Sequence, residues 1–122
     1  MLLNCVLVGL GGCLGSICRY LLSLLPYWER TGFPMVTLII NVLGSFIIGL
    51  LVGISMRFSG ANSHLLTFLR IGFCGGFTTF STFALEMSGL LSTGRIWSGI
   101  SYVVLSVLLG IGAVFAGKAL IS

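Results

Sequence analysis

The fold is decided by residues 72–83, which read GFCGGFTTFSTF in the middle of a long apolar segment. Gly75 and Gly76 stand in a position where glycine costs about 1 kcal/mol relative to alanine, and Thr78 and Thr79 are also weak helix formers. A break here would free backbone N–H and C=O groups, which are expensive to leave unpaired in lipid. Broken membrane helices are tolerated where they line a cavity, and their freed carbonyls can hold a cation. The stretch therefore predicts an interrupted helix, with a continuous helix that packs through its glycines as the alternative.

The composition around this stretch is that of a membrane protein. The chain has 122 residues, of which 57% are hydrophobic and 7% charged, whereas soluble domains carry about 25% charged residues. A helix crosses the hydrocarbon core with about 20 apolar residues, and the sequence predicts four such spans at about 2–25, 33–56, 68–92 and 96–118. We expect a single transmembrane domain over residues 1–122, all-α and multi-pass, in the cell inner membrane.

The basic residues give little preference for one orientation in the membrane. With four spans, the side of the termini holds Arg57, Arg70 and Lys118, and the opposite side holds Arg19, Arg30 and Arg95. Because an excess of Lys and Arg in cytoplasmic loops orients a membrane protein, this near-tie predicts insertion both ways up and antiparallel pairs. The alternative is one orientation set by something other than these charges. Basic residues so dispersed do not indicate a nucleic-acid partner.

Polar side chains recur at helical spacing inside two of the spans. Thr37, Asn41 and Ser45 are four residues apart and form one stripe, and Tyr102 and Ser106 have the same spacing in the last span. Polar groups in lipid usually face a bundle interior or a water-filled path. The Asn41 amide offers two donors and an acceptor, so it serves either as a contact between helices or as part of a path for a polar solute.

The aromatic and charged side chains of the spans suit the binding of an anion better than that of a cation. Phe80 and Phe83 are three residues apart on one helical face, and aromatic rings carry positive edges; the alternative is that both rings pack or face lipid. Arg19 is either an anchor in the headgroups or an attractor for anions. Glu86 is the one acid within the spans, and no serine, cysteine or threonine there has an evident histidine partner, so we expect no enzyme.

Three motifs together resemble the CrcB/Fluc fluoride channel family. They are residues 11–20 (GGCLGSICRY), 37–49 (TLIINVLGSFIIG) and 72–83. The resemblance covers essentially the whole chain. It implies an antiparallel, dual-topology homodimer of four-helix subunits in the lipid bilayer, which exports toxic fluoride passively through two pores and holds a structural sodium ion at its centre.

The resemblance also assigns roles to particular residues. It implies that the pore is lined by Asn41, Phe80 and Phe83 together with a track of hydroxyls, Thr37, Ser81, Thr82, Tyr102 and Ser106. It places Arg19 at a vestibule and gives the sodium ion the backbone carbonyls of Gly75 and Thr78. Gly110 stands where a further serine would continue the track in the last span, so this chain departs from the pattern at that point.

Two other functions remain as alternatives. A small multidrug-resistance exporter also has four spans, but it needs a glutamate in the first span to exchange drug for protons, and this chain has no acid there. An accessory membrane subunit without transport is the second. Purified protein in liposomes would separate them, because an accessory subunit passes no ion and an exporter requires a proton gradient.

Overall fold

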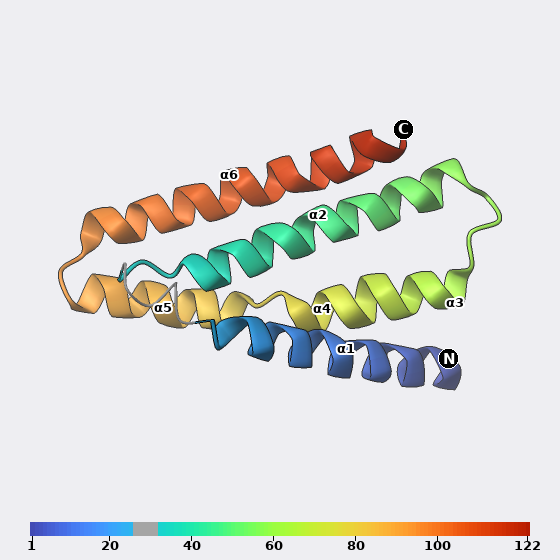
Figure 1. Ribbon diagram of the computed structural model, residues 1–122, viewed down its shortest axis with the longest axis horizontal. Helices are drawn as coiled ribbons and strands as arrows, with labels where there is room; N and C mark the ends of the chain where they lie inside the picture. Colours follow the sequence, from blue (N-terminus) through green and yellow to red (C-terminus); the bar gives the residue numbers. More distant parts are fainter. Residues whose placement is uncertain (26–31) are drawn as a thin grey trace.

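A computed structural model describes residues 1–25 and 32–122 as helices joined by short connections (Figure 1). Four helical segments are long and apolar enough to cross a membrane: α1 (Leu2–Ser23), α2 (Met35–Arg57), a composite third segment over Ser63–Ser92, and α6 (Ile96–Ile121). The prediction of an all-α protein with four spans is thereby confirmed. The connection expected near 26–32, with Glu29 and Arg30, lies almost entirely outside the described residues.

The third segment is interrupted, as residues 72–83 predict. It consists of α3 (Ser63–Leu66), a π-helix η2 (Thr67–Phe73), α4 (Cys74–Phe77) and α5 (Phe80–Ser92). Between α4 and α5 the backbone is extended, with φ −80° and ψ 157° at Thr78 and φ −148° and ψ 121° at Thr79. The break therefore falls on the threonine pair, directly after the two glycines.

The third segment begins at Ser63, earlier than the predicted residue 68. The side chain of Asn62 accepts hydrogen bonds from the backbone N–H groups of His64 (3.0 Å) and Leu65 (3.1 Å). Asparagine is a preferred N-cap because it satisfies N–H groups that have no partner in the first turn of a helix. This cap is a local sequence signal that hydropathy alone does not detect.

Glycines bring the helices into close contact in two pairs. A Cβ on Gly15 of α1 would overlap the carbonyl oxygen of Phe73, and one on Gly76 would lie 2.5 Å from the carbonyl oxygen of Gly12. In the same way, α2 and α6 approach through Gly49, where a Cβ would overlap the carbonyl oxygen of Val114. Small residues at such contacts let the backbones approach closely, which is how membrane helices gain packing energy.

The arrangement leaves one end of the bundle with both termini and the α2–α3 connection, and the other end with the turn from α5 to α6 (Figure 1). The buried core is small and lies near the second of these ends. Its main cluster there consists of Leu38, Leu90 and the fully buried Tyr102, with Phe83 and Met87 packed against them. The other buried apolar side chains among the described residues are Ile40, Leu51, Cys74 and Phe77. Most other large apolar side chains are exposed, as expected for faces that meet lipid or another protein chain.

Candidate functional site

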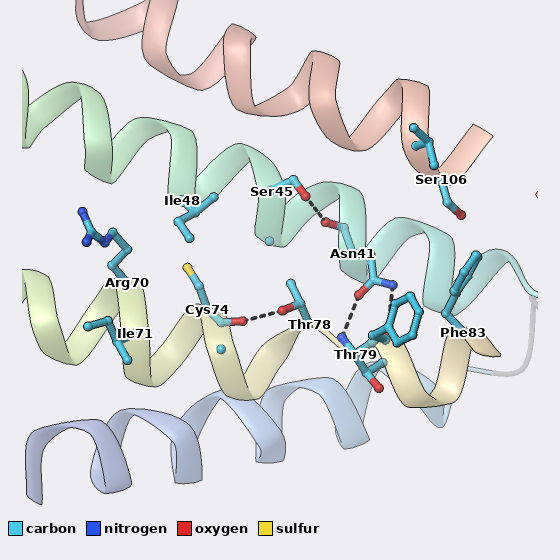
Figure 2. Close-up of a pocket in the computed structure, with 14 residues that line it drawn as sticks. Asn41, Ser45, Ile48, Arg70, Ile71, Cys74, Thr78, Thr79, Phe83 and Ser106 are labelled. Carbon is cyan, nitrogen blue, oxygen red and sulfur yellow. Dashed lines mark hydrogen bonds between the residues drawn. The ribbon is translucent and has the colours of Figure 1, made fainter. Parts of the chain in front are cut away.

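A cavity of about 630 Å³ runs beside the helix break, between α2, α6 and the third segment (Figure 2). We call it the groove. Its lining includes Arg70, Cys74, Ser45 and Thr79 and six residues of the predicted site, namely Asn41, Gly75, Thr78, Phe80, Phe83 and Ser106. The structure thus brings the larger part of the predicted site together on one surface.

Asn41 ties α2 to the break. Its Nδ2 donates to the carbonyl oxygen of Thr79 at 3.0 Å, and its Oδ1 accepts the N–H of the same residue at 2.8 Å (Figure 2). The bond to Oδ1 satisfies the Thr79 N–H, which the interruption has removed from the helix ladder, and the bond from Nδ2 adds a second contact to the carbonyl at the start of α5. A primary amide carries two N–H donors, so one N–H of Asn41 remains for the groove.

Thr79 also starts the helix beyond the break. Its hydroxyl oxygen accepts the backbone N–H of Thr82 at 3.2 Å and lies 3.1 Å from the Thr82 hydroxyl. Threonine is a good N-cap for this reason. Ser81 and Thr82 stand in the first turn of α5, Ser81 exposed and Thr82 half-buried, and neither contributes to the lining of the groove.

The carbonyl oxygens of Gly75 and Thr78 have both lost their usual helical donors. In a continuous helix they would accept the N–H groups of Thr79 and Thr82, but those groups are donated to Asn41 and to the Thr79 hydroxyl. Gly75 is exposed, and a Cβ on it would meet nothing within 4 Å among the described residues. Two carbonyls freed in this way fit the donor set that alkali cations take from unwound membrane helices.

The phenylalanines of α5 have different surroundings. Their ring centroids are 5.8 Å apart, but Phe80 is 78% exposed whereas Phe83 is half-buried against Tyr102, with centroids 4.9 Å apart. The edge-on contact of Phe83 with Tyr102 fixes one ring in place. Phe80 projects from the chain and can contribute to a surface shared with another molecule.

Three hydroxyl side chains of the predicted track are wholly or partly buried, and of these only Ser106 lines the groove. Thr37, which is buried, donates a hydrogen bond to the Glu86 carboxylate. The hydroxyls of Tyr102 and Ser106 are buried and find no hydrogen-bond partner among the described residues. A buried hydroxyl without a partner is destabilising, so these positions favour an outside group that accepts hydrogen bonds. The pairing of Thr37 with Glu86 was not foreseen, because it joins residues 49 positions apart.

Two arginines lie in places that the sequence did not indicate. The Nε of Arg19 donates to the carbonyl oxygen of Gly76 at 3.3 Å, so Arg19 holds α4 from the side of α1 and does not line the groove. Arg70, counted above among the charges at the end of the protein, lies within η2 and lines the groove. The vestibule role of Arg19 stays a prediction.

The family is established by comparison with known proteins. The sequence model of the family described as "CrcB-like protein, Camphor Resistance (CrcB)" matches residues 6–118. The chain belongs to the CrcB family. Its similar relatives are named "Fluoride-specific ion channel FluC". One from Rhizobium meliloti is 49% identical over 94% of this chain and 93% of its own length, and one from Ruminiclostridium cellulolyticum is 45% identical over 98% and 92%.

A third CrcB relative of the same name, from Methanopyrus kandleri, is 45% identical over 92% of this chain and 84% of its own length. The resemblance carried by residues 11–20, 37–49 and 72–83 is therefore confirmed. These relatives are named as channels, which also confirms the expectation that the chain is not an enzyme. Together with four membrane-length helices, the family makes the chain a multi-pass membrane protein.

Proposed function

We propose that this chain is a fluoride channel, through which fluoride leaves the cell down its own gradient. The observation that carries the proposal is the donor set of the groove: the free N–H of Asn41, the unpartnered hydroxyl of Ser106, and the rings of Phe80 and Phe83, with no acid in the described lining. Fluoride holds its hydration shell tightly, so a pore has to replace that shell with donors along its length. The names of the relatives support the same ion.

The working unit is proposed to be an antiparallel homodimer in the inner membrane, with two pores. A single chain leaves the extended backbone of the break and the exposed Gly75 on its surface. Irregular backbone is not tolerated against lipid and has to be covered by protein or line a water-filled cavity. A second copy provides that cover, and the exposed Phe80 of each copy then contributes to the wall of a pore. The near-tie of basic residues favours the antiparallel arrangement.

A sodium ion is proposed to lie between the two copies. The carbonyls of Gly75 and Thr78, whose helical donors are engaged elsewhere, would hold it. The ion would supply fixed positive charge beside the pores. The residues of this chain do the rest: Asn41 and Arg19 hold the two sides of the break in place, and the hydroxyls and ring edges line the path of the anion.

The proposal is tested by ion efflux from liposomes that contain only this purified protein. Fluoride and chloride are loaded together, valinomycin balances the charge with potassium, and two ion-selective electrodes follow release. We expect fluoride to leave and chloride to be retained, without a proton gradient. Release that requires a proton gradient would favour the exporter, and no release of either ion would favour an accessory subunit. Liposomes without protein provide the baseline.

A further inference from the structure

The hydroxyl stripe of α6 ends inside the groove. Tyr102 and Ser106 are four residues apart on one face, and the next position at this spacing is Gly110, which has no side chain to offer. Across from it lies Ser45 of α2. A Cβ on Gly110 would be 3.7 Å from the Ser45 Oγ, and no other described atom outside its own helix is as close. At this level of the groove, the hydroxyl comes from α2.

Ser45 is placed to continue the row of hydroxyls that Tyr102 and Ser106 begin on α6. It is half-buried, lines the groove, and lies between Asn41 and Ile48 along α2 (Figure 2). Its Oγ donates to the carbonyl oxygen of Asn41 at 2.7 Å. A serine hydroxyl that bonds back to the preceding turn of its own helix can rotate about one bond. The same proton can therefore point at the carbonyl or into the groove.

Without Ser45, an anion that moves along the groove from Asn41 toward Arg70 would soon lack a strong hydrogen-bond donor. From Ser45 toward Arg70, α2 and η2 present Ile48 and Ile71 to the groove, and these donate no hydrogen bonds (Figure 2). Cys74 adds only a thiol, which is a weak donor, and the Thr78 hydroxyl donates to the carbonyl oxygen of Cys74 at 2.8 Å. Arg70 stands beyond Ile48 (Figure 2). An anion that leaves the Asn41 amide in this direction meets apolar side chains before it meets a charge. A rotating hydroxyl at Ser45 shortens that gap.

We propose that Ser45 is a conduction residue of this channel, which supplies to the passing anion the hydroxyl that α6 lacks at Gly110. The inference rests on the proposed function. It makes a compensatory prediction, because the missing hydroxyl can be supplied from the opposite helix. A serine at 110 would place its Oγ near the position from which Ser45 Oγ is removed, with ordinary van der Waals room for the new Cβ.

The test is fluoride efflux from liposomes with three variants. Ser45→Ala is expected to lower the efflux rate about tenfold or more, the effect of losing one hydrogen bond to an ion. Ser45→Ala/Gly110→Ser is expected to regain most of the lost rate. The matched control is Ser45→Ala/Gly112→Ser, because Gly112 is exposed, has open space around it among the described residues, and lies about 160° from Gly110 around the helix axis. It is expected to stay as slow as Ser45→Ala.

Several results would overturn the inference. Native efflux in Ser45→Ala would do so, and so would a folded double variant with Gly110→Ser that stays slow, since Ser45 would then act only by positioning Asn41. If native protein passes no fluoride, the proposed function itself fails. Gly110→Ser alone gives a test that needs no alanine variant to fold. A second hydroxyl at this point should preserve fluoride efflux, and a loss of about tenfold would contradict the inference.

Discussion

The side chain of Asn41 pairs with both backbone polar groups of Thr79, donating to its carbonyl oxygen at 3.0 Å and accepting its N–H at 2.8 Å. An amide on α2 thereby replaces the helical partner that the Thr79 N–H loses at the break, and it adds a hydrogen bond to the carbonyl that starts α5. Since one N–H of the amide is left over, the same side chain serves the groove. Stability of the break and donation to the anion are thus coupled through one residue.

We expect Asn41→Asp to impair both functions. The carboxylate keeps an acceptor for the Thr79 N–H but faces its carbonyl oxygen without a donor, and it repels an approaching anion. Hydrogen bonds between membrane helices contribute roughly 0.6–1.7 kcal/mol, so a fall in stability of at least that size is expected. Fluoride efflux from liposomes should fall about tenfold or more. Thermal unfolding in detergent measures the first effect and a fluoride electrode the second.

Asn62→Asp is the matched control for this variant. Asn62 caps the third segment in an exposed position outside the groove, and aspartate caps helices about as well as asparagine. We expect its efflux and its unfolding temperature to stay close to those of the native protein. If Asn41→Asp behaved like this control, Asn41 would have no part in conduction.

The two phenylalanines should separate in their effects. Phe83→Ile loses the ring contact with Tyr102 in the small core, so it should lower both stability, by about 1 kcal/mol, and fluoride efflux. Phe80→Ile changes a ring that is 78% exposed in the single chain, and should lower efflux with little change in subunit stability. Phe115→Ile, an exposed ring on α6 away from the groove, should conduct normally. Native efflux in both variants of α5 would exclude a role for the ring edges.

Local sequence features were sufficient to predict the architecture. Four apolar stretches give four spans, and the glycine and threonine pairs in residues 72–83 give a break, because both depend on the chain near each position. The π-helix η2, by contrast, has no recognised signature in the sequence. It packs closely on α1 at Gly72, whose Cβ would lie 2.9 Å from the carbonyl oxygen of Val8, and contacts of this kind between distant segments are not visible in the local sequence.

Contacts within the site were harder to predict, because they join distant parts of the chain. Thr37 with Glu86, and Arg19 with Gly76, are separated by 49 and 57 residues. Helical spacing shows which residues share a face of one helix, but it does not show which face of a second helix they meet. The same reason explains Arg70, whose position in the sequence indicates an end of the protein and whose side chain lines the groove.

The contact of α1 with the segment before the break leads to a third prediction. A methyl group on Gly15 would overlap the carbonyl oxygen of Phe73 and lie 2.8 Å from the backbone nitrogen of Phe77. Because both are backbone atoms, relief requires the helices to separate, and overpacking of this kind costs about 1–3 kcal/mol or more. Gly15→Ala should lower the unfolding temperature and, by moving Gly76 from Arg19, reduce fluoride efflux.

Gly9→Ala is its control on the same helix. Gly9 is exposed and has nothing within 4 Å of its Cβ position among the described residues. Alanine is the better helix former by about 1 kcal/mol, so this variant should be as stable as the native protein or slightly more so. Equal behaviour of the two alanine variants would show that α1 can move away from the third segment at no cost.

The proposed sodium site gives a last prediction, which concerns assembly. If the carbonyls of Gly75 and Thr78 from two copies share an ion, replacement of sodium by N-methylglucamine should shift purified protein from dimer toward monomer and stop fluoride efflux. Gly75→Ala should raise the sodium concentration needed for dimers without unfolding the subunit, because the added methyl enters open space on the exposed side. Gly112→Ala, equally open but on α6, should leave the requirement unchanged. Dimers that persist and conduct in the absence of sodium would show that the carbonyls are satisfied by some other partner.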